Sequence, residues 1–176
     1  ILFVNICFAE TNELTPQQDK IGKIDQNLKY ISLNLSDSII DLIIETLNFS
    51  EKLNYSNGIE QSHFYLARYL GLNNQVDSAI YYYKKGIELA KANPKSEILG
   101  SLYVNLGVVY WNTSDYSSGL EIAIEAKEHF EKEGTLYEKY DLFNLLGLCY
   151  DGLLDSQQAI LHFSQAAEIA LEKNQE

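Results

Sequence analysis

The sequence has few prolines, few cysteines and no methionine. Each shortage bears on a different question: how long the helices can be, whether a metal or disulfide framework is present, and whether the chain begins at a translation start. Two prolines in 176 residues leave long segments free to be helical, because proline interrupts a helix interior. The two cysteines, Cys7 and Cys149, form neither a CxxC pair nor a cysteine–histidine cluster, which argues against a metal site or a disulfide framework. Because the chain begins with isoleucine and has no methionine, we expect it to be a fragment or a processed form.

Positive charge is also scarce. The chain has 13 Lys and Arg against 25 Asp and Glu, which gives a net charge of −12. Nucleic acids and anionic membrane surfaces need a basic footprint, so we expect neither as a partner. The acidic excess is most simply a way to keep a helical surface soluble. With 46% hydrophobic residues, the chain can build the core of a globular domain.

The sequence contains no motif for catalysis or cofactor binding. His63, His129 and His162 lie outside any HExxH or Ser/His/Asp-like context, and the glycines lie inside helical patterns instead of a phosphate-binding loop. We interpret His63 as a packed core histidine and Cys149, within an apolar helical pattern, as a small core residue. We therefore expect no enzyme activity, no catalytic residue, no cofactor and no metal.

What the sequence does contain is a repeat of 40 residues. Small residues recur at this step in three series. The series are Ala67, Gly107 and Gly147; Ala79, Gly119 and Ala159; and Gly86, Ala126 and Ala166. A fixed period of this kind predicts one supersecondary module stacked on copies of itself. Apolar residues at helical spacing on both sides of short polar turns indicate that each module is a pair of helices.

The repeat divides the chain into four helix pairs, about eight helices in all. Residues 57–94, 95–134 and 135–174 form three clear units, and residues 17–56 form a degenerate first pair, as is common for a terminal unit. Turn and stop signals set the predicted boundaries. These signals are Asn57-Gly58, Asn73-Asn74, Asn93-Pro94, residues 112–115, Gly134 and Asp151-Gly152.

This pattern resembles the tetratricopeptide repeat (TPR). The fourth unit carries the residues of that motif nearly perfectly, and the third and second carry it with departures. The matching residues are Phe143, Leu146, Gly147, Tyr150, Ala159, Phe163 and Ala166; then Tyr103, Leu106, Gly107, Tyr110, Gly119, Ala123 and Ala126; then His63, Leu66, Ala67, Leu70, Ala79, Tyr83 and Gly86. The resemblance implies an all-α, TPR-type solenoid in which antiparallel helix pairs form a right-handed superhelix.

Packing explains why these positions repeat. Small residues of the first two series should let the two helices of a unit approach closely, and those of the third should let the next unit pack on the second helix. Aromatic residues fill the remaining space, so Tyr110 and Tyr150 should lie in the core. The period exceeds the usual one of about 34 residues. In this respect the sequence resembles the long-period TPR arrays of bacterial sensor histidine kinases and related regulators.

The resemblance also implies a partner-binding groove, lined by the first helix of each unit. The corresponding residues are Gln61, Phe64, Tyr65, Arg68 and Leu72; Ser101, Val104, Asn105, Val108, Trp111 and Asn112; and Asp141, Asn144, Leu145, Leu148 and Asp151. Asn105 either contacts a bound peptide backbone or makes a helix-to-helix hydrogen bond, and Trp111 either serves as a binding hot spot or covers the turn between units. Arg68 is the one cation, so a hydrophobic peptide or a helix fits the groove better than a carboxylate clamp does.

The first nine residues, ILFVNICFA, form an apolar run too short to span a bilayer. Small Cys7 and Ala9 resemble a cleavage site, which predicts a signal-peptide remnant at 1–9 and a linker at 10–16; the alternative is a capping helix or strand. We therefore expect a non-catalytic protein- or peptide-binding module, the extracytoplasmic (periplasmic) sensory or interaction domain of a bacterial signal-transduction protein, with membrane contact only through flanking segments. The alternatives are a free-standing scaffold or assembly protein and a cytoplasmic peptide-responsive regulator.

Overall fold

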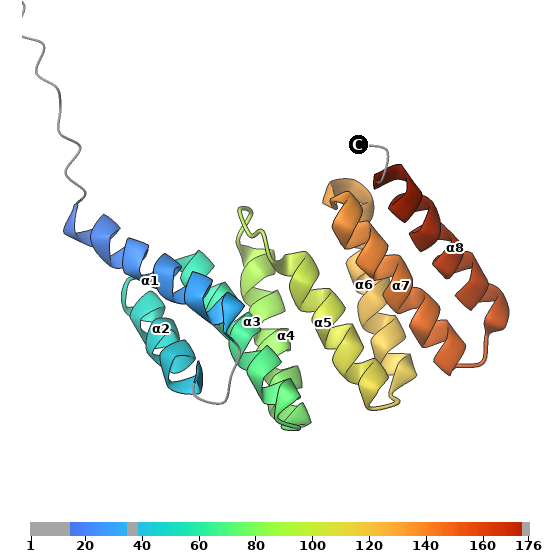
Figure 1. Cartoon of the computed structure of the whole chain (residues 1–176), viewed down its shortest axis with the longest axis horizontal. Coiled ribbons are helices and arrows are strands. Elements are labelled where there is room, and N and C mark those ends of the chain that lie inside the picture. Colours follow the sequence, from blue (N-terminus) through green and yellow to red (C-terminus); the bar gives the residue numbers. More distant parts are fainter. Residues whose placement is uncertain (1–14, 35–38, 174–176) are drawn as a thin grey trace, which may run out of the picture.

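The computed structural model describes residues 15–34 and 39–173, and within these ranges the chain is helical with no strand (Figure 1). The predictions for residues 1–9, and most of the linker, lie outside the described residues. The helices are α1 (Pro16–Leu33), α2 (Ile40–Lys52), α3 (Ser56–Leu72), α4 (Val76–Ala92), α5 (Leu99–Asn112), α6 (Tyr116–Glu133), α7 (Leu136–Gly152) and α8 (Ser156–Lys173). The predicted all-α fold of stacked helix pairs is confirmed.

Local sequence explains where several helices begin. Thr15 caps α1 and Thr135 caps α7, and in both cases the side chain three residues on, Gln18 or Glu138, bonds back to the cap backbone. Such capping boxes satisfy amide groups that have no partner inside the helix. Pro16 occupies the first turn of α1, where its missing N–H costs nothing. The two capping boxes therefore define the first residues of α1 and α7, which the repeat pattern alone places only approximately.

Four helices end in the same kind of turn. Each turn has one residue in the left-handed region, namely Asn54, Asn74, Ser114 and Leu154, with φ between 50° and 63°. The following amide donates to a carbonyl five residues earlier, as in Gln75 N to Leu70 O at 2.9 Å. This pattern is a Schellman motif, which satisfies carbonyl groups at the end of a helix.

Two of the predicted turns are wrong. Gly58 lies buried inside α3, and a Cβ there would sit 2.7 Å from Tyr55 Cδ1, so this glycine serves close packing and not a turn. The chain turns instead at Leu53 and Asn54. Gly152 likewise belongs to the end of α7, and the turn follows at Leu153 and Leu154. An Asn-Gly or Asp-Gly pair predicts a turn only where the backbone needs a positive φ.

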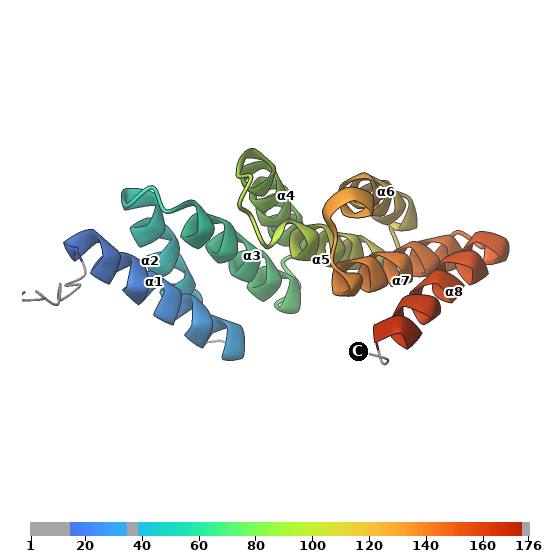
Figure 2. The same cartoon turned by 90° about the horizontal axis from the view of Figure 1, so that it is seen from above.

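The helices form a curved, two-layered row. Each helix packs against the next, and α1, α3, α5 and α7 also contact one another in order. Figure 2 shows α4 and α6 on the outer side of the bend and α3, α5 and α7 on the inner side. The first helices of the pairs therefore share one concave surface.

The core repeats with the same period as the sequence. Every residue from 62 to 86 has the same degree of burial as the residue 40 positions later, and all nine small residues of the three series are buried. Tyr103, Tyr83 and Phe130 are among the largest fully enclosed side chains. Tyr110 is buried as predicted, and half-buried Tyr150 packs against the core. Because burial repeats with the sequence, the second and third units pack against their neighbouring units through the same positions.

The contacts of the small residues correct one part of the packing prediction. A Cβ on Gly107 would overlap Leu145, which belongs to α7 of the next unit, so Gly107 brings successive units together. A Cβ on Gly119 would lie 3.4 Å from the carbonyl oxygen of Gly107, so Gly119 provides the close approach within the unit. A Cβ on Gly86 would lie 2.7 Å from Leu102 of α5, which agrees with the predicted contact between units.

Candidate partner-binding groove

The predicted groove residues lie on α3, α5 and α7, which form the concave layer. Exposed members alternate with half-buried ones along each helix, so the layer offers both polar groups and apolar surface. The exposed members are Arg68, Leu72, Ser101, Val108, Asn112, Asp141 and Asp151, and the half-buried members are Gln61, Phe64, Tyr65, Val104, Asn105, Trp111, Asn144 and Leu148. Leu145 is the exception: it is buried, because it fills the space beside Gly107, and its assignment to the groove is wrong.

Asn105 uses its amide inside its own helix. The Nδ2 group donates to the backbone oxygen of Ser101 at 2.8 Å, so this donor bridges neither to another helix nor away from α5. The amide oxygen remains an acceptor that an N–H of a bound chain can use. The bond also fixes the orientation of the side chain.

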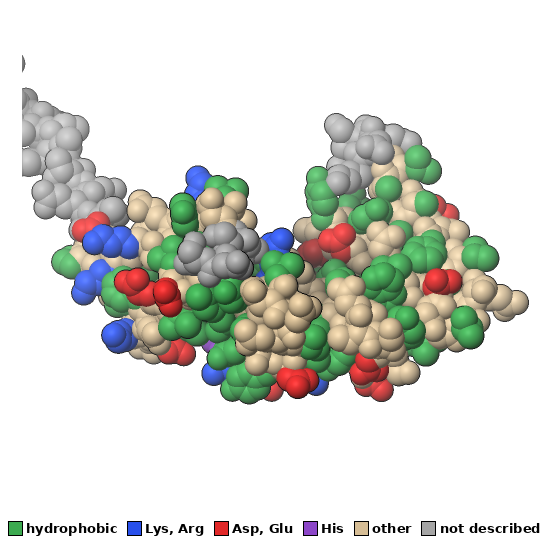
Figure 3. All heavy atoms as spheres, turned by 60° about the horizontal axis from the view of Figure 1, so that its bottom comes forward, with side chains coloured by type: hydrophobic (Ala, Val, Ile, Leu, Met, Phe, Trp, Pro, Cys, Tyr) green, Lys and Arg blue, Asp and Glu red, His purple; other side chains and the backbone are tan. Residues whose placement is uncertain are grey.

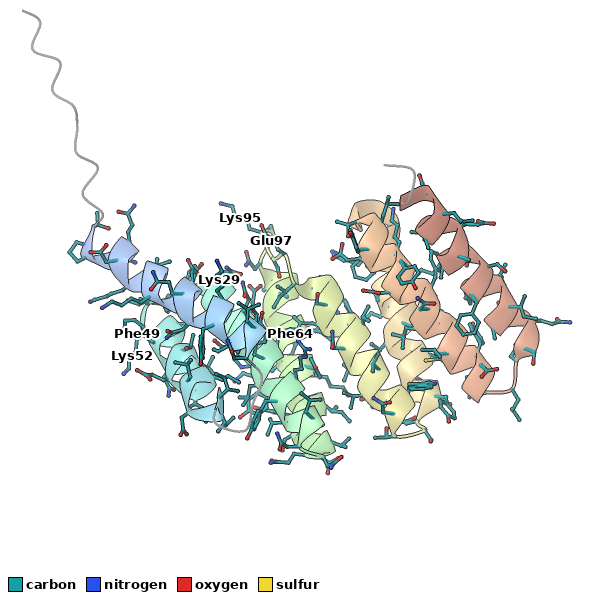
Figure 4. All side chains as sticks on the ribbon, in the orientation of Figure 1. Lys29, Phe49, Lys52, Phe64, Lys95 and Glu97 are labelled. Carbon is teal, nitrogen blue, oxygen red and sulfur yellow. The ribbon has the colours of Figure 1, made fainter. Side chains whose placement is uncertain are left out.

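Phe64 and Tyr65 join the groove to the core. Their rings meet edge-on with centroids 5.2 Å apart, and Phe64 also meets Tyr83 of α4 edge-on at 6.2 Å. Both rings remain half-buried. Figure 4 shows Phe64 on α3 and Lys29 on the neighbouring α1. An aromatic surface held by core contacts is pre-organised, which lowers the entropy lost when a partner binds.

A hollow of about 290 Å³ lies between α1 and the first half of α3. A chain of hydrogen bonds crosses it: Gln61 donates to Asn57 at 2.9 Å, Asn57 to the Tyr55 hydroxyl at 3.2 Å, and that hydroxyl to Asp25 at 2.8 Å. Burial and the nearby Asp25 carboxylate raise the pKa of Tyr55, so its hydroxyl stays a neutral donor. Gln61 and Tyr65 both line this hollow.

The sequence analysis missed the contribution of the first helix. Asp25, Lys29 and Ser32 of α1 line the hollow, and Lys29 adds a cation to Arg68 on this surface. The repeat carried the signal, because Asp25 stands 40 residues before Tyr65. Asp25 is an acidic residue where the second unit has Tyr65, so the two positions do not look alike, and the 40-residue repeat was not extended into residues 17–56.

His63 and Cys149 are titratable side chains that lie buried in the core. His63 is enclosed as predicted, its Nδ1 lies 2.8 Å from the Ile59 carbonyl oxygen, and burial lowers its pKa. Burial raises the pKa of the Cys149 thiol to about 11, so this thiol is not nucleophilic at neutral pH. Among the described residues, no three His, Cys, Asp or Glu side chains gather in a way that could hold a metal ion. None of the helices in the described ranges combines the length and apolar character needed to cross a membrane.

These features define a helical-repeat protein of the TPR type, and comparison with solved structures agrees. BtubC (BKLC) from P. vanneervenii superimposes with a TM-score of 0.69 at 20% identity, over 89% of this chain and 60% of that one. A kinesin-light-chain-like protein from Podosopora anserina with nearly identical TPR-like repeats gives 0.63 at 14% identity, over 93% and 81%. MamA gives 0.54 at 15% identity, over 93% and 99%.

The chain thus spans about 60% of the length of the BtubC structure. No protein-family model and no curated protein sequence matches it. The structural likeness therefore establishes the fold, and function must be argued from the groove.

Proposed function

We propose that this protein binds a peptide, or an extended segment of another protein, along the concave layer of α1, α3, α5 and α7, and that it carries out no chemistry itself. The observation that supports this most directly is the row of half-buried aromatic and amide side chains on that layer, such as Tyr65, Asn105 and Asn144. Amide groups can pair with an extended backbone, while the aromatic surface contacts apolar side chains. Lys29 and Arg68 favour a partner with an acidic group near the α1–α3 end.

Peptide selection followed by a matched pair of variants tests this proposal. Peptides selected from a displayed random library are titrated against the wild type, Val108→Asp and Ile124→Asp. Val108 on α5 and Ile124 on α6 are both exposed aliphatic residues of the third unit, but they belong to opposite layers. Val108→Asp should weaken binding at least about tenfold, equivalent to about 1.4 kcal/mol. Ile124→Asp should leave the affinity unchanged.

The single tryptophan, Trp111, gives a direct signal, because it is half-buried at the end of a groove helix. A peptide in the groove should shift its fluorescence emission. Equal affinity of the wild type and Val108→Asp, or a loss seen only with Ile124→Asp, would place the binding surface elsewhere and refute the proposal.

We further propose that the module is the extracytoplasmic sensory or interaction domain of a bacterial signal-transduction protein. The apolar run at residues 1–9 and the small residues Cys7 and Ala9 support an exported protein. N-terminal sequencing of the protein from its native cells should find Glu10 as the first residue. An uncleaved chain that keeps residues 1–9 would contradict export by this route.

A further inference from the structure

A cleft of about 560 Å³ lies between α2 and α4, with α3 as its floor. We call it the α2–α4 cleft. Apolar and charged side chains both line it, among them Ile44, Leu66, Leu70, Glu51 and Lys85. Hydrophobic side chains reach the surface at several places, with acidic and basic ones between them (Figure 3). The volume is that of a small-molecule site. Because the cleft opens between second helices of the pairs, it is separate from the concave groove.

The floor of the α2–α4 cleft holds a buried nitrogen atom that lacks a hydrogen bond. His63 lines the cleft and is 1% exposed, and its Nε2 has no partner among the described residues. Its Nδ1 lies 2.8 Å from the Ile59 carbonyl oxygen, which can only accept, so Nδ1 carries the proton. Burial lowers the pKa of the ring, so Nε2 is an unprotonated acceptor at neutral pH. A buried acceptor of this kind favours a group that donates to it.

The next unit fills the corresponding place with its own hydroxyl group. Tyr103 stands 40 residues after His63, and its hydroxyl donates to Glu125 at 3.1 Å. Glu125 also pairs with Lys91, so the three side chains bridge α4 and α6. In the α2–α4 cleft the imidazole of His63 is shorter than a tyrosine side chain and carries no hydroxyl group.

The charged bridge is also different in the α2–α4 cleft. Glu51 and Lys85 stand 40 residues before Lys91 and Glu125, with the charges exchanged, and these two described residues form no ion pair. Both charged groups therefore remain available to a ligand beside His63.

Two further positions of the α2–α4 cleft hold smaller side chains than the next unit does. Leu70 stands where that unit has Tyr110, and Ile44 stands where it has Lys84. In the next unit Lys84 Nζ lies 5.8 Å from the centre of the Tyr110 ring, so these two side chains cover the corresponding floor. The differences amount to an aromatic ring and a hydroxyl group, next to a nitrogen that accepts a hydrogen bond.

We propose that the α2–α4 cleft binds a small apolar molecule that carries a hydroxyl group, such as a phenol, and that this hydroxyl donates to His63 Nε2. The ring of the ligand lies on Ile44 and Leu70. A hydroxyl group suits the site because it donates to Nε2 and also accepts from Lys85, whereas an ammonium group accepts nothing. The half-buried Tyr82 ring lies beside His63 with centroids 5.9 Å apart, and rotation of this side chain gives the ligand room at Nε2.

Phenol and benzene test the proposal, because they differ only by the hydroxyl group. Each is titrated into the ¹⁵N-labelled full chain and followed by NMR, at ligand concentrations up to about 20 mM, since a ligand of this size binds in the millimolar range. Phenol should bind at least about fivefold more tightly than benzene, equivalent to about 1 kcal/mol. Phenol should also shift the Nε2 resonance of His63, which the spectrum of His63→Phe identifies by its loss.

Two variants and a matched control test the position of the site. His63→Phe removes the acceptor but keeps a ring, as Phe143 does two units on, so it should abolish the preference for phenol. Ile44→Lys copies Lys84 of the next unit and should weaken phenol binding at least about fivefold. Ile124 is exposed and has the same repeat position on α6 that Ile44 has on α2, so Ile124→Lys should leave binding unchanged. Circular dichroism confirms that the variants remain folded.

Absence of phenol binding over this range would overturn the proposal. Equal binding of phenol and benzene would overturn it as well, because the hydroxyl group would then have no part. An unchanged Nε2 resonance would mean that water alone satisfies His63, and the proposal would fail. Phenol binding that persists in both His63→Phe and Ile44→Lys would place the ligand elsewhere, with the same consequence.

Discussion

Gly107 and Leu145 should behave as one coupled pair, because the glycine leaves the space that the leucine fills. A methyl group at position 107 would overlap Leu145 Cδ2 and lie 3.2 Å from its Cγ. Leu145 is 1% exposed, so it has little room to move away. Overpacking of this kind costs about 1–3 kcal/mol. Replacing glycine with alanine inside a helix also stabilises the helix by about 1 kcal/mol, because alanine has the higher helix propensity. We therefore expect Gly107→Ala to lower stability by about 0–2 kcal/mol.

A second substitution isolates the contact. Leu145→Ala alone removes a buried side chain and should cost about 2–5 kcal/mol. In the double variant the new methyl group meets no clash, so the loss should be smaller than the sum of the single losses by about 1–3 kcal/mol. At the preceding unit the corresponding positions hold Ala67 and Asn105, so a methyl group occurs there opposite a residue other than leucine.

Urea denaturation followed by circular dichroism and Trp111 fluorescence gives the four free energies of the cycle. Gly22→Ala is the control, because a Cβ at Gly22 meets nothing within 4 Å, so this change should stabilise α1 by the full helix propensity of about 1 kcal/mol. Additive losses to within about 0.5 kcal/mol would refute the reasoning. The proposed clash would also be refuted if Gly107→Ala raised the free energy of unfolding as much as Gly22→Ala does.

Three further predictions follow from single buried or strained residues. Burial lowers the pKa of His63 and His162 below the ordinary value of 6.5. Their contribution to the free energy of unfolding is therefore fully present above pH 6.5 and is lost as pH falls from 6.5 through the lower pKa of the folded protein. In urea titrations at several pH values, His63→Phe should flatten this dependence. Leu154 is 89% exposed and has φ 63°, a left-handed conformation that is unfavourable for a residue with a Cβ. Leu154→Gly should therefore stabilise the protein by up to about 1 kcal/mol and raise its Tm by about 2–4 °C. An unchanged or lower Tm would exclude strain at that turn. Cys149, with a buried thiol of pKa about 11, should resist a thiol reagent at pH 8 until urea is added, and rapid labelling of the native protein at Cys149 would contradict this burial.

The fold could be predicted from the sequence because its determinants are periodic. Nine small residues at a step of 40 are enough to indicate stacked helix pairs, and each of them is buried. The turns could not be placed as well, because the signal at a turn is a single residue. Leu154 adopts a left-handed conformation without being Gly or Asn, while Gly58 is needed for packing inside a helix. At such positions tertiary contacts outweigh local preference.

The groove was only partly predictable for a related reason. A repeat register tells which helix face is concave, but not which side chain is pulled into the core. Leu145 was misplaced because its burial depends on a glycine 38 residues earlier. Asp25 and Lys29 were missed because residues 17–56 depart from the motif, so the repeat register was not carried into this pair.

One position shows how the same fold accommodates different sequences. His63, Tyr103 and Phe143 occupy it in successive units. Tyr103 donates to Glu125 at 3.1 Å, and Glu125 pairs with Lys91 across α4 and α6. One unit earlier the same two places hold Lys85 and Glu51, with the charges exchanged.

An aromatic ring is common to the three units, whereas the hydroxyl group that bonds to Glu125 is present in one of them, so packing of the ring is the shared part of the contact. A fold maintained by volume at a few positions can keep its shape while most other residues change. That agrees with a shared fold at only 14–20% identity.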